Sequence, residues 1–340
     1  YDGPEYHELP LDRLSPADVT LKSGYGHQAD VAILLRAMLS AVLVDSRFVF
    51  INSDLVYSPE LKEDAVDSYD LFDTILVAVD DNGATYYLNE GSQYAELRAT
   101  SFDGRVYADV ANRKWAKLTP DVGYADSLTT HYNIDVERDG TAAVEIITEY
   151  RGTLVGDFRR LYKEITPEDR RRHVLETVSA YSRNAVLDRD YETDTDSYPG
   201  IRRLRMRIRG WAVKEGDLLN MRLLGSASTA VVPRYGERRL PFFRSGVNRL
   251  KDIWTVRFPE GMSAVKLLPE KNEFAAVGTG TELTTTCSSA IDEDRHLNVK
   301  VARTAKLERA LFGPDAYTRF MQAALKTQGR KADTVVISNQ

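Results

Sequence analysis

The pattern of hydrophobic and polar positions is clearest near the start of the chain, between residues 23 and 54. A glycine-punctuated loop leads into an apolar run at 29–42, in which the only strongly polar positions after Asp30 are Arg36 and Ser40. A surface helix would show a single apolar stripe, so this run predicts a helix that is buried on most of its sides. Asp30 in the first turn suits the positive end of the helix dipole.

Four strands are predicted after this helix. Residues 47–51 are rich in β-branched and aromatic side chains, which are typical of a strand. Residues 72–79 alternate toward a buried strand, and the turn cluster at 80–83 joins them to a returning strand at 84–88. A further strand is expected near 105–110.

The pattern changes beyond residue 118. A hairpin is predicted about Asp139-Gly140, and Thr166-Pro167 followed by acidic residues predicts the start of a helix that runs to about Asn184. We expect the inner face of that helix to carry Val174, Leu175, Val178 and Tyr181. The strands that follow have roughly the spacing of an all-β sandwich, and a last helix is expected at Pro314–Lys326.

Composition narrows the function classes. Of the 340 residues, 43% are hydrophobic and 28% are charged, as in ordinary soluble proteins. The formal net charge of −6 argues against a protein built mainly to bind nucleic acid. The single cysteine, Cys287, excludes an intramolecular disulfide and a cysteine-rich metal site, and its place in a predicted strand of the second part of the chain favours a buried structural thiol. No signal peptide or membrane-spanning segment is recognisable.

The first part of the chain resembles the transglutaminase-like superfamily, which has a papain-type fold. The family's loop, Tyr-Gly-Asp-Cys-x-Asp followed by Ala-x-Leu-Leu, matches residues 25–30 and 32–35. The resemblance places Gln28 at the position of the cysteine nucleophile, Thr74 at that of the histidine and Asn89 at that of the aspartate.

The residue types at these three positions do not support acyl transfer. A cysteine nucleophile works as a thiolate beside a base, whereas Gln28 has no ionisable group and Thr74 cannot carry a proton near neutral pH. Asn89 could orient an imidazole, but none is expected there. Gln28 is also explained simply as an amide at a helix start that bonds to its neighbours.

The second part of the chain is similar to a β-rich domain of unknown function that follows the transglutaminase-like domain in some bacterial proteins. The similarity rests on residues 240–243, 258–261, 267–269 and 317–320. We therefore expect an α+β chain, with a transglutaminase-like domain at 1–118 and a β-sandwich-like domain with two helices at 119–340. The resemblance implies that a further β-rich domain precedes the first in such proteins, and Tyr1 in place of a methionine suggests a longer parent.

Other candidate residues have structural explanations beside functional ones. His7, His27 and Asp30 could be metal ligands, but their spacing is not diagnostic. Arg203, Arg205, Arg207 and Arg209 would form a basic stripe on one strand face, either for an anionic partner or paired with acids such as Glu145 and Glu149.

Three functions remain open from the sequence. The first is a catalytically inactive protein that binds a peptide, glycopeptide or protein near Tyr25, His27, Gln28, Thr74 and Asn89. The second is a hydrolase or acyltransferase with Ser23 or Tyr25 as a substituted nucleophile and His27 as its base. The third is an interaction module carried by the β-rich domain. No cofactor is expected, the sequence leaves the oligomeric state open, and a periplasmic or cell-envelope location would require a signal peptide that has been removed.

Overall fold

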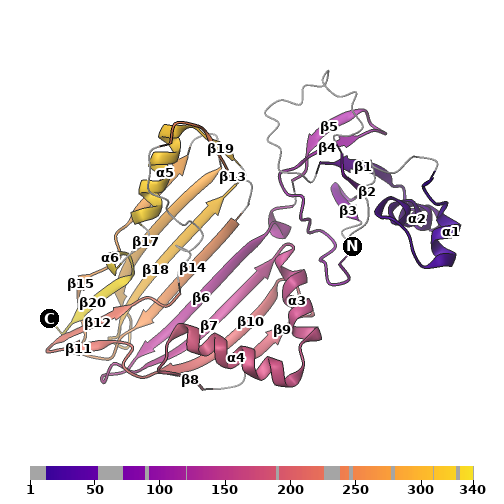
Figure 1. The fold of residues 1–340 in the computed structure, drawn as a ribbon. Coiled ribbons are helices and arrows are strands. Elements are labelled where there is room, and N and C mark those ends of the chain that lie inside the picture. The colour runs from indigo at the N-terminus through magenta and orange to yellow at the C-terminus, as the bar shows by residue number, and fades with distance from the viewer. Residues whose placement is uncertain are drawn as a thin grey trace. The chain divides into compact units, whose positions relative to one another are not determined.

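The computed structural model describes residues 13–52, 72–88, 92–119, 121–188, 191–225, 238–244, 248–276, 280–308, 310–326 and 330–339. Its contacts divide the chain into two compact units, Tyr1–Ala125 and Asp126–Gln340. The division falls shortly after the boundary expected from the sequence. The fold is mixed α+β and consists mostly of sheet (Figure 1).

The first unit is a small antiparallel sheet with helices packed against it. The sheet has the order β3-β2-β1-β4-β5, and α2 contacts β2. The elements in chain order are α1 (Ala17–Ser23), α2 (Gln28–Ala41), β1 (Arg47–Ile51), β2 (Thr74–Asp81), β3 (Ala84–Leu88), β4 (Val106–Asp109), β5 (Lys114–Lys117) and the 3-10 helix η4 (Val122–Tyr124).

The prediction that the first long helix is buried on most sides is wrong. Only Ala29, Asp30 and Ala32 of α2 are buried, whereas Val31 and Met38 are 41% and 55% exposed. The helix packs one face on the sheet through a cluster that contains Ala29, Ala32, Ile75 and Val77. The described part of the unit supplies no layer that buries the opposite face, so an apolar helix keeps an apolar outer side.

The second unit is built on a nine-stranded sheet with the order β16-β17-β18-β14-β6-β7-β10-β8, and β9 pairs with β10. Its strands are β6 (Ser127–Val136), β7 (Ala142–Arg151), β8 (Ala185–Leu187), β9 (Glu192–Asp194), β10 (Gly200–Ile208), β14 (Asn248–Arg257), β16 (Asn272–Ala276), β17 (Thr281–Ile291) and β18 (Leu297–Leu307). The pair β6–β14 is parallel, and its members lie far apart in the sequence.

The remaining elements cover one face of this sheet (Figure 1). They are the helices α3 (Leu154–Glu164), α4 (Pro167–Tyr181), α5 (Pro314–Lys326) and α6 (Arg330–Asp333), the sheet β11-β12-β20-β15 (Val213–Glu215, Leu218–Arg222, Thr334–Ser338, Ala264–Leu267), and the pair β13 (Phe242–Arg244) and β19 (Ala310–Phe312). The strand spacing predicted a sandwich, whereas helices and short strands together cover this face of the sheet.

The core of the second unit follows a row of paired residues across five strands. Leu204, Ile146, Tyr132, Trp254 and Val301 lie side by side in register, and all are at least 96% buried. The alternation of polar and apolar residues along each strand places these side chains on the covered face. The opposite face of the same strands therefore carries the polar positions.

Most of the predicted elements of the second unit are present, with differences in detail. The hairpin about Gly140, the capped start of α4 at Thr166 and the helix α5 are formed. Leu175, expected on the inner face of α4, is 58% exposed. The helix α3 was not predicted, although Val155, Phe158 and Tyr162 recur on its buried face at helical spacing.

Candidate functional site

The loop that begins α2 is held by a capping box. The His27 ring accepts a hydrogen bond from the Ala29 N–H through Nδ1 at 3.2 Å, and the Asp30 carboxylate accepts one from the His27 N–H at 2.9 Å. Asp30 also accepts from the Ser15 N–H at 2.6 Å. Because Nδ1 is an acceptor, a neutral His27 ring carries its proton on Nε2. His27 and Asp30 thus hold the start of the helix.

The glycines of this loop have a packing explanation. Gly24 ends α1 with a φ of +64°, in the left-handed region that favours glycine. At Gly26 a Cβ atom would lie 2.8 Å from Thr20 Cγ2 and 2.9 Å from Asp30 Cβ. A side chain at position 26 would therefore push the loop away from the two helices that it connects.

Gln28, Thr74 and Asn89 are the positions that the resemblance matches to the family's cysteine, histidine and aspartate, and the first two lie at the starts of elements that pack together. Gln28 is the first residue of α2 and is half-buried, and Thr74 is the first residue of β2 and is 6% exposed. The residues that follow them, Ala29 and Ile75, belong to one hydrophobic cluster. Asn89 lies outside the described residues.

Ser23 and Tyr25 make contacts of a turn. The Ser23 hydroxyl donates to the Tyr25 carbonyl at 2.8 Å and accepts from the Tyr25 N–H at 3.3 Å. The Tyr25 side chain is 71% exposed. These contacts hold the segment between α1 and α2, and they give the Ser23 hydroxyl a backbone partner.

Metal and thiol chemistry find little support in the described part of the chain. Within it, no group of three or more His, Cys, Asp or Glu side chains is placed to hold a metal ion. His7 lies outside the described residues. The Cys287 thiol is half-buried in β17 and donates to the Pro269 carbonyl at 3.3 Å, and burial raises its pKa. A thiol with a raised pKa is a poor nucleophile at neutral pH.

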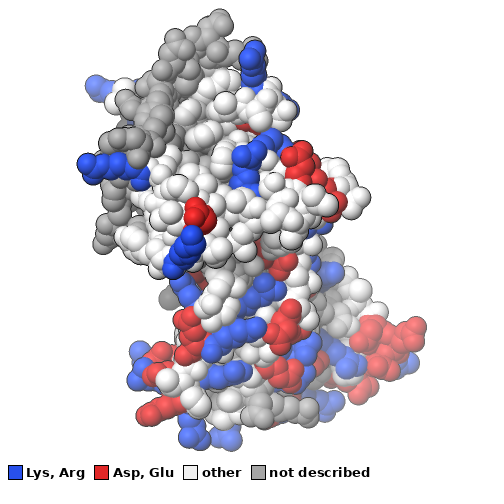
Figure 2. All heavy atoms as spheres, turned by 90° about the vertical axis from the view of Figure 1, so that its right-hand side faces the viewer, with Lys and Arg blue, Asp and Glu red and all other residues white. Residues whose placement is uncertain are grey.

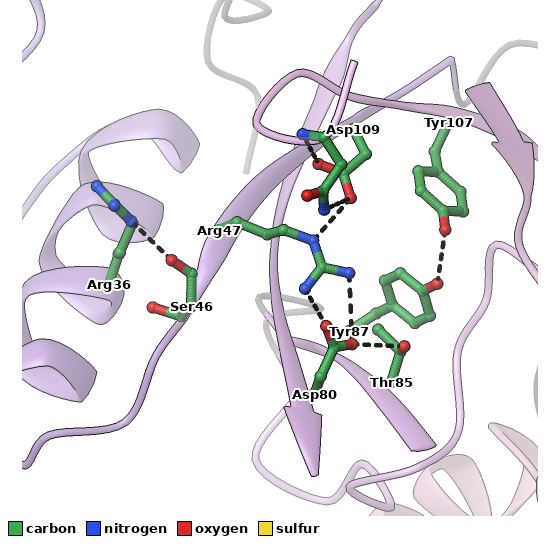
Figure 3. A network of polar contacts seen from close by, with 9 residues as sticks. Arg36, Ser46, Arg47, Asp80, Thr85, Tyr87, Tyr107 and Asp109 are labelled. Carbon is green, nitrogen blue, oxygen red and sulfur yellow. Dashed lines mark hydrogen bonds and ion pairs between the residues drawn. The ribbon is translucent and has the colours of Figure 1, made fainter. Parts of the chain in front are cut away.

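The polar centre of the first unit is an arginine between two carboxylates (Figure 3). Arg47, at the start of β1, donates from Nε to Asp109 Oδ2 at 2.7 Å and from Nη1 to Asp80 Oδ2 at 2.5 Å. Asp109 is 3% exposed and also accepts two hydrogen bonds from Asn112. This network joins β1 to both neighbouring strands, and no pattern in the sequence predicted it.

A pair of tyrosines lies beside this network. The hydroxyls of Tyr87 in β3 and Tyr107 in β4 are 3.3 Å apart, and their rings meet edge to face (Figure 3). Burial, together with the hydrogen bond to Tyr107, raises the pKa of Tyr87. The Tyr87 phenol therefore stays protonated at neutral pH and serves as a hydrogen-bonding group.

The arginine stripe of the second unit is neutralised by acids. Arg205 donates from Nε to Glu145 at 2.9 Å and from Nη1 to Glu192 at 2.9 Å, and Arg203 bonds to the same two acids. The prediction that acids pair with the stripe is confirmed for Glu145. In the lower part of Figure 2, basic and acidic side chains are interspersed.

Two details of the stripe differ from the prediction. Glu149 pairs with Arg151, at 3.4 Å, and Arg207 pairs with Glu137. Arg209 lies beyond the end of β10, so it is not part of the strand face. The stripe is thus a ladder of ion pairs on the polar face of the sheet.

A cavity of about 520 Å³ opens beside the second half of α2. It is lined by Ile33, Arg36, Ala37, Ser40, Leu43, Val44, Asp45, Ser46 and Phe48. None of the binding residues predicted from the sequence lines this cavity. The signal that could have found it is the isolated pair Arg36 and Ser40, the two polar interruptions of an otherwise apolar helix, which both face the cavity.

Comparisons with known proteins leave the family open. No family model and no curated protein matches the chain. A solved structure from Parabacteroides distasonis ATCC 8503, described as a "putative protease", matches with 14% identity over 95% of this chain and a TM-score of 0.46. This chain spans 46% of that structure, which is less than half of its length. Among the described helices, none is both long and apolar enough to cross a membrane.

Proposed function

We propose that the first unit is a transglutaminase-like domain without acyl-transfer chemistry, and that the protein acts by binding a peptide, a glycopeptide or another protein. The observation that supports this most directly is the residue at the start of α2. The family carries a thiolate at that helix N-terminus, and this chain has the Gln28 amide. An amide cannot attack a carbonyl, because it has no ionisable group near neutral pH.

The surroundings of Gln28 favour a binding role over a repaired active site. His27, the nearest imidazole in sequence, accepts a hydrogen bond from the Ala29 N–H as a helix cap, and Ser23 bonds to backbone atoms of Tyr25. A half-buried amide offers two donors and one acceptor, which suit the carbonyl and N–H groups of a peptide backbone. The N-terminal end of a helix also favours carbonyl oxygens and anions.

The proposal is tested first by activity. The full chain should show no transamidation of an amine probe into a glutamine peptide, and no hydrolysis of an amide peptide, above the uncatalysed rate. A rate that disappears in Gln28→Ala would overturn the proposal. Label transfer from a serine-reactive or tyrosine-reactive probe, lost on substitution of Ser23 or Tyr25, would favour the hydrolase instead.

The second test is binding. A panel of peptides and peptidoglycan-derived glycopeptides is screened by the backbone amide signals of the isotope-labelled protein. A true ligand should shift the signals of Gln28 and Thr74. The Gln28→Ala substitution should lower the affinity for that ligand by about tenfold, which corresponds to the loss of one to two hydrogen bonds. The matched control is Gln93→Ala, which makes the same chemical change at an exposed position of the same unit.

A second candidate is an interaction carried by the polar face of the nine-stranded sheet. The ion-pair ladder that includes Arg205, Glu145 and Glu192 favours it, because interspersed charges give a surface specificity for a complementary partner. A partner that the full chain captures, and that Arg205→Glu releases while Gln28→Ala does not, would support this candidate.

A further inference from the structure

The cavity beside α2 combines the features of a built ligand site. Its lining alternates an arginine, an aspartate and two serines with apolar side chains, and its volume of about 520 Å³ lies in the range of small-molecule and peptide pockets. Its residues come from the second half of α2, from the turn that follows and from β1. Gln28, Thr74 and Asn89 are not among the lining residues.

Arg36 is positioned before any ligand arrives. Its Nε donates to the Ser46 carbonyl at 3.1 Å (Figure 3). Its guanidinium carbon lies 5.1 Å from the centre of the Phe48 ring. These two contacts restrain the guanidinium group. Within the described part of the chain, its two terminal nitrogens have no ion pair or hydrogen bond. A planar fork with two remaining nitrogens matches the two oxygens of a carboxylate.

Asp45 supplies the opposite charge in the same cavity. Its side chain is exposed, and among the described residues it forms no ion pair, with Arg36 or with any other cation. A carboxylate accepts hydrogen bonds only, so it suits an N–H group of a ligand. The cavity therefore offers a donor fork and an acceptor together.

Leu43 is the second observation that points to a ligand. Its φ is +62°, in the left-handed region that disfavours a branched side chain, and it is 95% exposed. It stands just after the end of α2, where glycine is the usual residue. The fold gains no burial from this leucine. Strain of this kind is typical of functional positions, and Leu43 adds an apolar wall to the cavity.

We propose that this cavity binds the C-terminal end of a peptide whose last side chain is apolar. The terminal carboxylate lies on the Arg36 fork, and the amide N–H of the last residue donates to Asp45. The last side chain packs among Leu43, Val44 and Phe48. This site stands independently of the Gln28 region, so either proposal can fail without the other.

The experiment is titration of the full, isotope-labelled chain with an N-acetylated Gly-Ala-Leu peptide, followed by backbone amide signals. The free-carboxylate form should shift the signals of Ser40, Asp45 and Phe48. The same peptide with an amidated end should bind about tenfold more weakly or worse, because one charge-assisted interaction is lost. A peptide that ends in glycine should also bind more weakly, by about tenfold.

Variants separate the groups involved. The Arg36→Gln substitution should lower the affinity for the free-carboxylate peptide by about tenfold or more. Arg36→Lys should lower it by a smaller factor, because lysine keeps the charge but lacks the planar fork. Leu43→Gly should lower the affinity for this peptide by about threefold to tenfold. The matched control is Arg113→Gln, which removes the charge of an exposed arginine in the turn between β4 and β5 and should leave the affinity unchanged.

Several outcomes would overturn the proposal. The first is that the signals of Ser40, Asp45 and Phe48 do not shift at millimolar peptide. The second is that the amidated peptide binds as tightly as the free-carboxylate peptide. The third is that Arg36→Gln and Arg113→Gln lower the affinity equally. Octanoate provides a carboxylate and an apolar chain without an amide N–H. If it binds as tightly as the peptide, the assignment to a peptide end is wrong. The comparison of the free and amidated peptides uses the unaltered protein, so it decides even where a variant does not fold.

Discussion

Replacing Arg47 by methionine should lower the free energy of unfolding of the first unit by about 2–4 kcal/mol. Arg47 joins β1 to Asp109 on β4 and to Asp80 on β2. Methionine keeps much of the aliphatic stem and removes the charge. The variant therefore leaves the Asp109 carboxylate, which is 3% exposed, without its cation.

The two halves of the network contribute unequally. Removing one partner of a buried ion pair costs about 3–5 kcal/mol, but Asn112 still donates two hydrogen bonds to Asp109, so we expect about 2–3 kcal/mol from this half. The Asp80 side chain is 58% exposed, and an ion pair in that setting contributes about 0–1 kcal/mol because water screens it. Asp80→Asn should therefore have a much smaller effect than Asp109→Asn.

The loss caused by Arg47→Met should depend on pH. Burial alone would raise the pKa of Asp109, but hydrogen bonds from Asn112 and Arg47 outweigh it and hold the pKa below its usual range. A carboxyl group with a lowered pKa stabilises the fold above its unfolded-state pKa of about 4, and this contribution is lost as the pH falls through the folded-state pKa. The difference between the two proteins should thus be full at pH 7 and shrink below about pH 4.

The assay uses the tryptophans as separate reporters. The chain has three, Trp115 in the first unit and Trp211 and Trp254 in the second. Fluorine NMR of the 5-fluorotryptophan protein in urea follows each unit through its own signal, and Trp115→Phe assigns the first. The Arg47→Met variant should move the Trp115 transition to lower urea and leave the other two unchanged.

A loss below about 1 kcal/mol at pH 7 would refute the assignment of Asp109 as a carboxylate that depends on its cation. Equal losses in Asp80→Asn and Asp109→Asn would refute the burial argument. The double variant Arg47→Met with Asp109→Asn should recover part of the stability, because no buried charge is then left unpaired.

Three further predictions follow from single positions. Leu43→Gly should raise the stability of the first unit by about 0.5–1 kcal/mol, seen as a later Trp115 transition, since it relieves a left-handed backbone at an exposed leucine. Gly140→Ala should destabilise the second unit by more than about 2 kcal/mol in urea unfolding, because its φ is +84° and a Cβ would collide with the Ala212 carbonyl oxygen; Gly216→Ala, with a φ of +61° and open space, should lose only about 1 kcal/mol. Trp254→Phe should cost about 2–4 kcal/mol by the same assay, since the indole is fully buried and its N–H donates to a backbone carbonyl at 2.7 Å.

The sequence predicted local elements well where one residue carries a strong local signal. The Thr166 hydroxyl accepts the Asp169 N–H at the start of α4, as the Thr-Pro-acid pattern indicates, and Gly140 sits in the predicted hairpin turn. Such signals depend only on backbone geometry within a few residues. The burial predicted for α2 was wrong because burial depends on tertiary neighbours. An apolar sequence does not determine how many other elements pack around a helix.

The sequence indicated the two candidate sites to different degrees. The loop from Gly24 to Asp30 was recognisable as a helix start, and its capping contacts are local. The cavity beside α2 joins residues 33 to 48 across a helix, a turn and a strand, so only Arg36 and Ser40 marked it in advance. The left-handed backbone of Leu43 cannot be read from a leucine.

The sequence by itself determined the mixed α+β character, the start of α2, the capped start of α4 and the absence of an ionisable group at Gln28. These follow from residue chemistry and short-range backbone preferences. Tertiary structure alone decided the strand order, the parallel pairing of β6 with β14, the pairing of Arg207 with Glu137 and the Arg47 network. These features depend on contacts between residues far apart in the sequence, such as Arg47 and Asp109, which are 62 positions apart. Packing, and not a local pattern, selects the partners in such contacts.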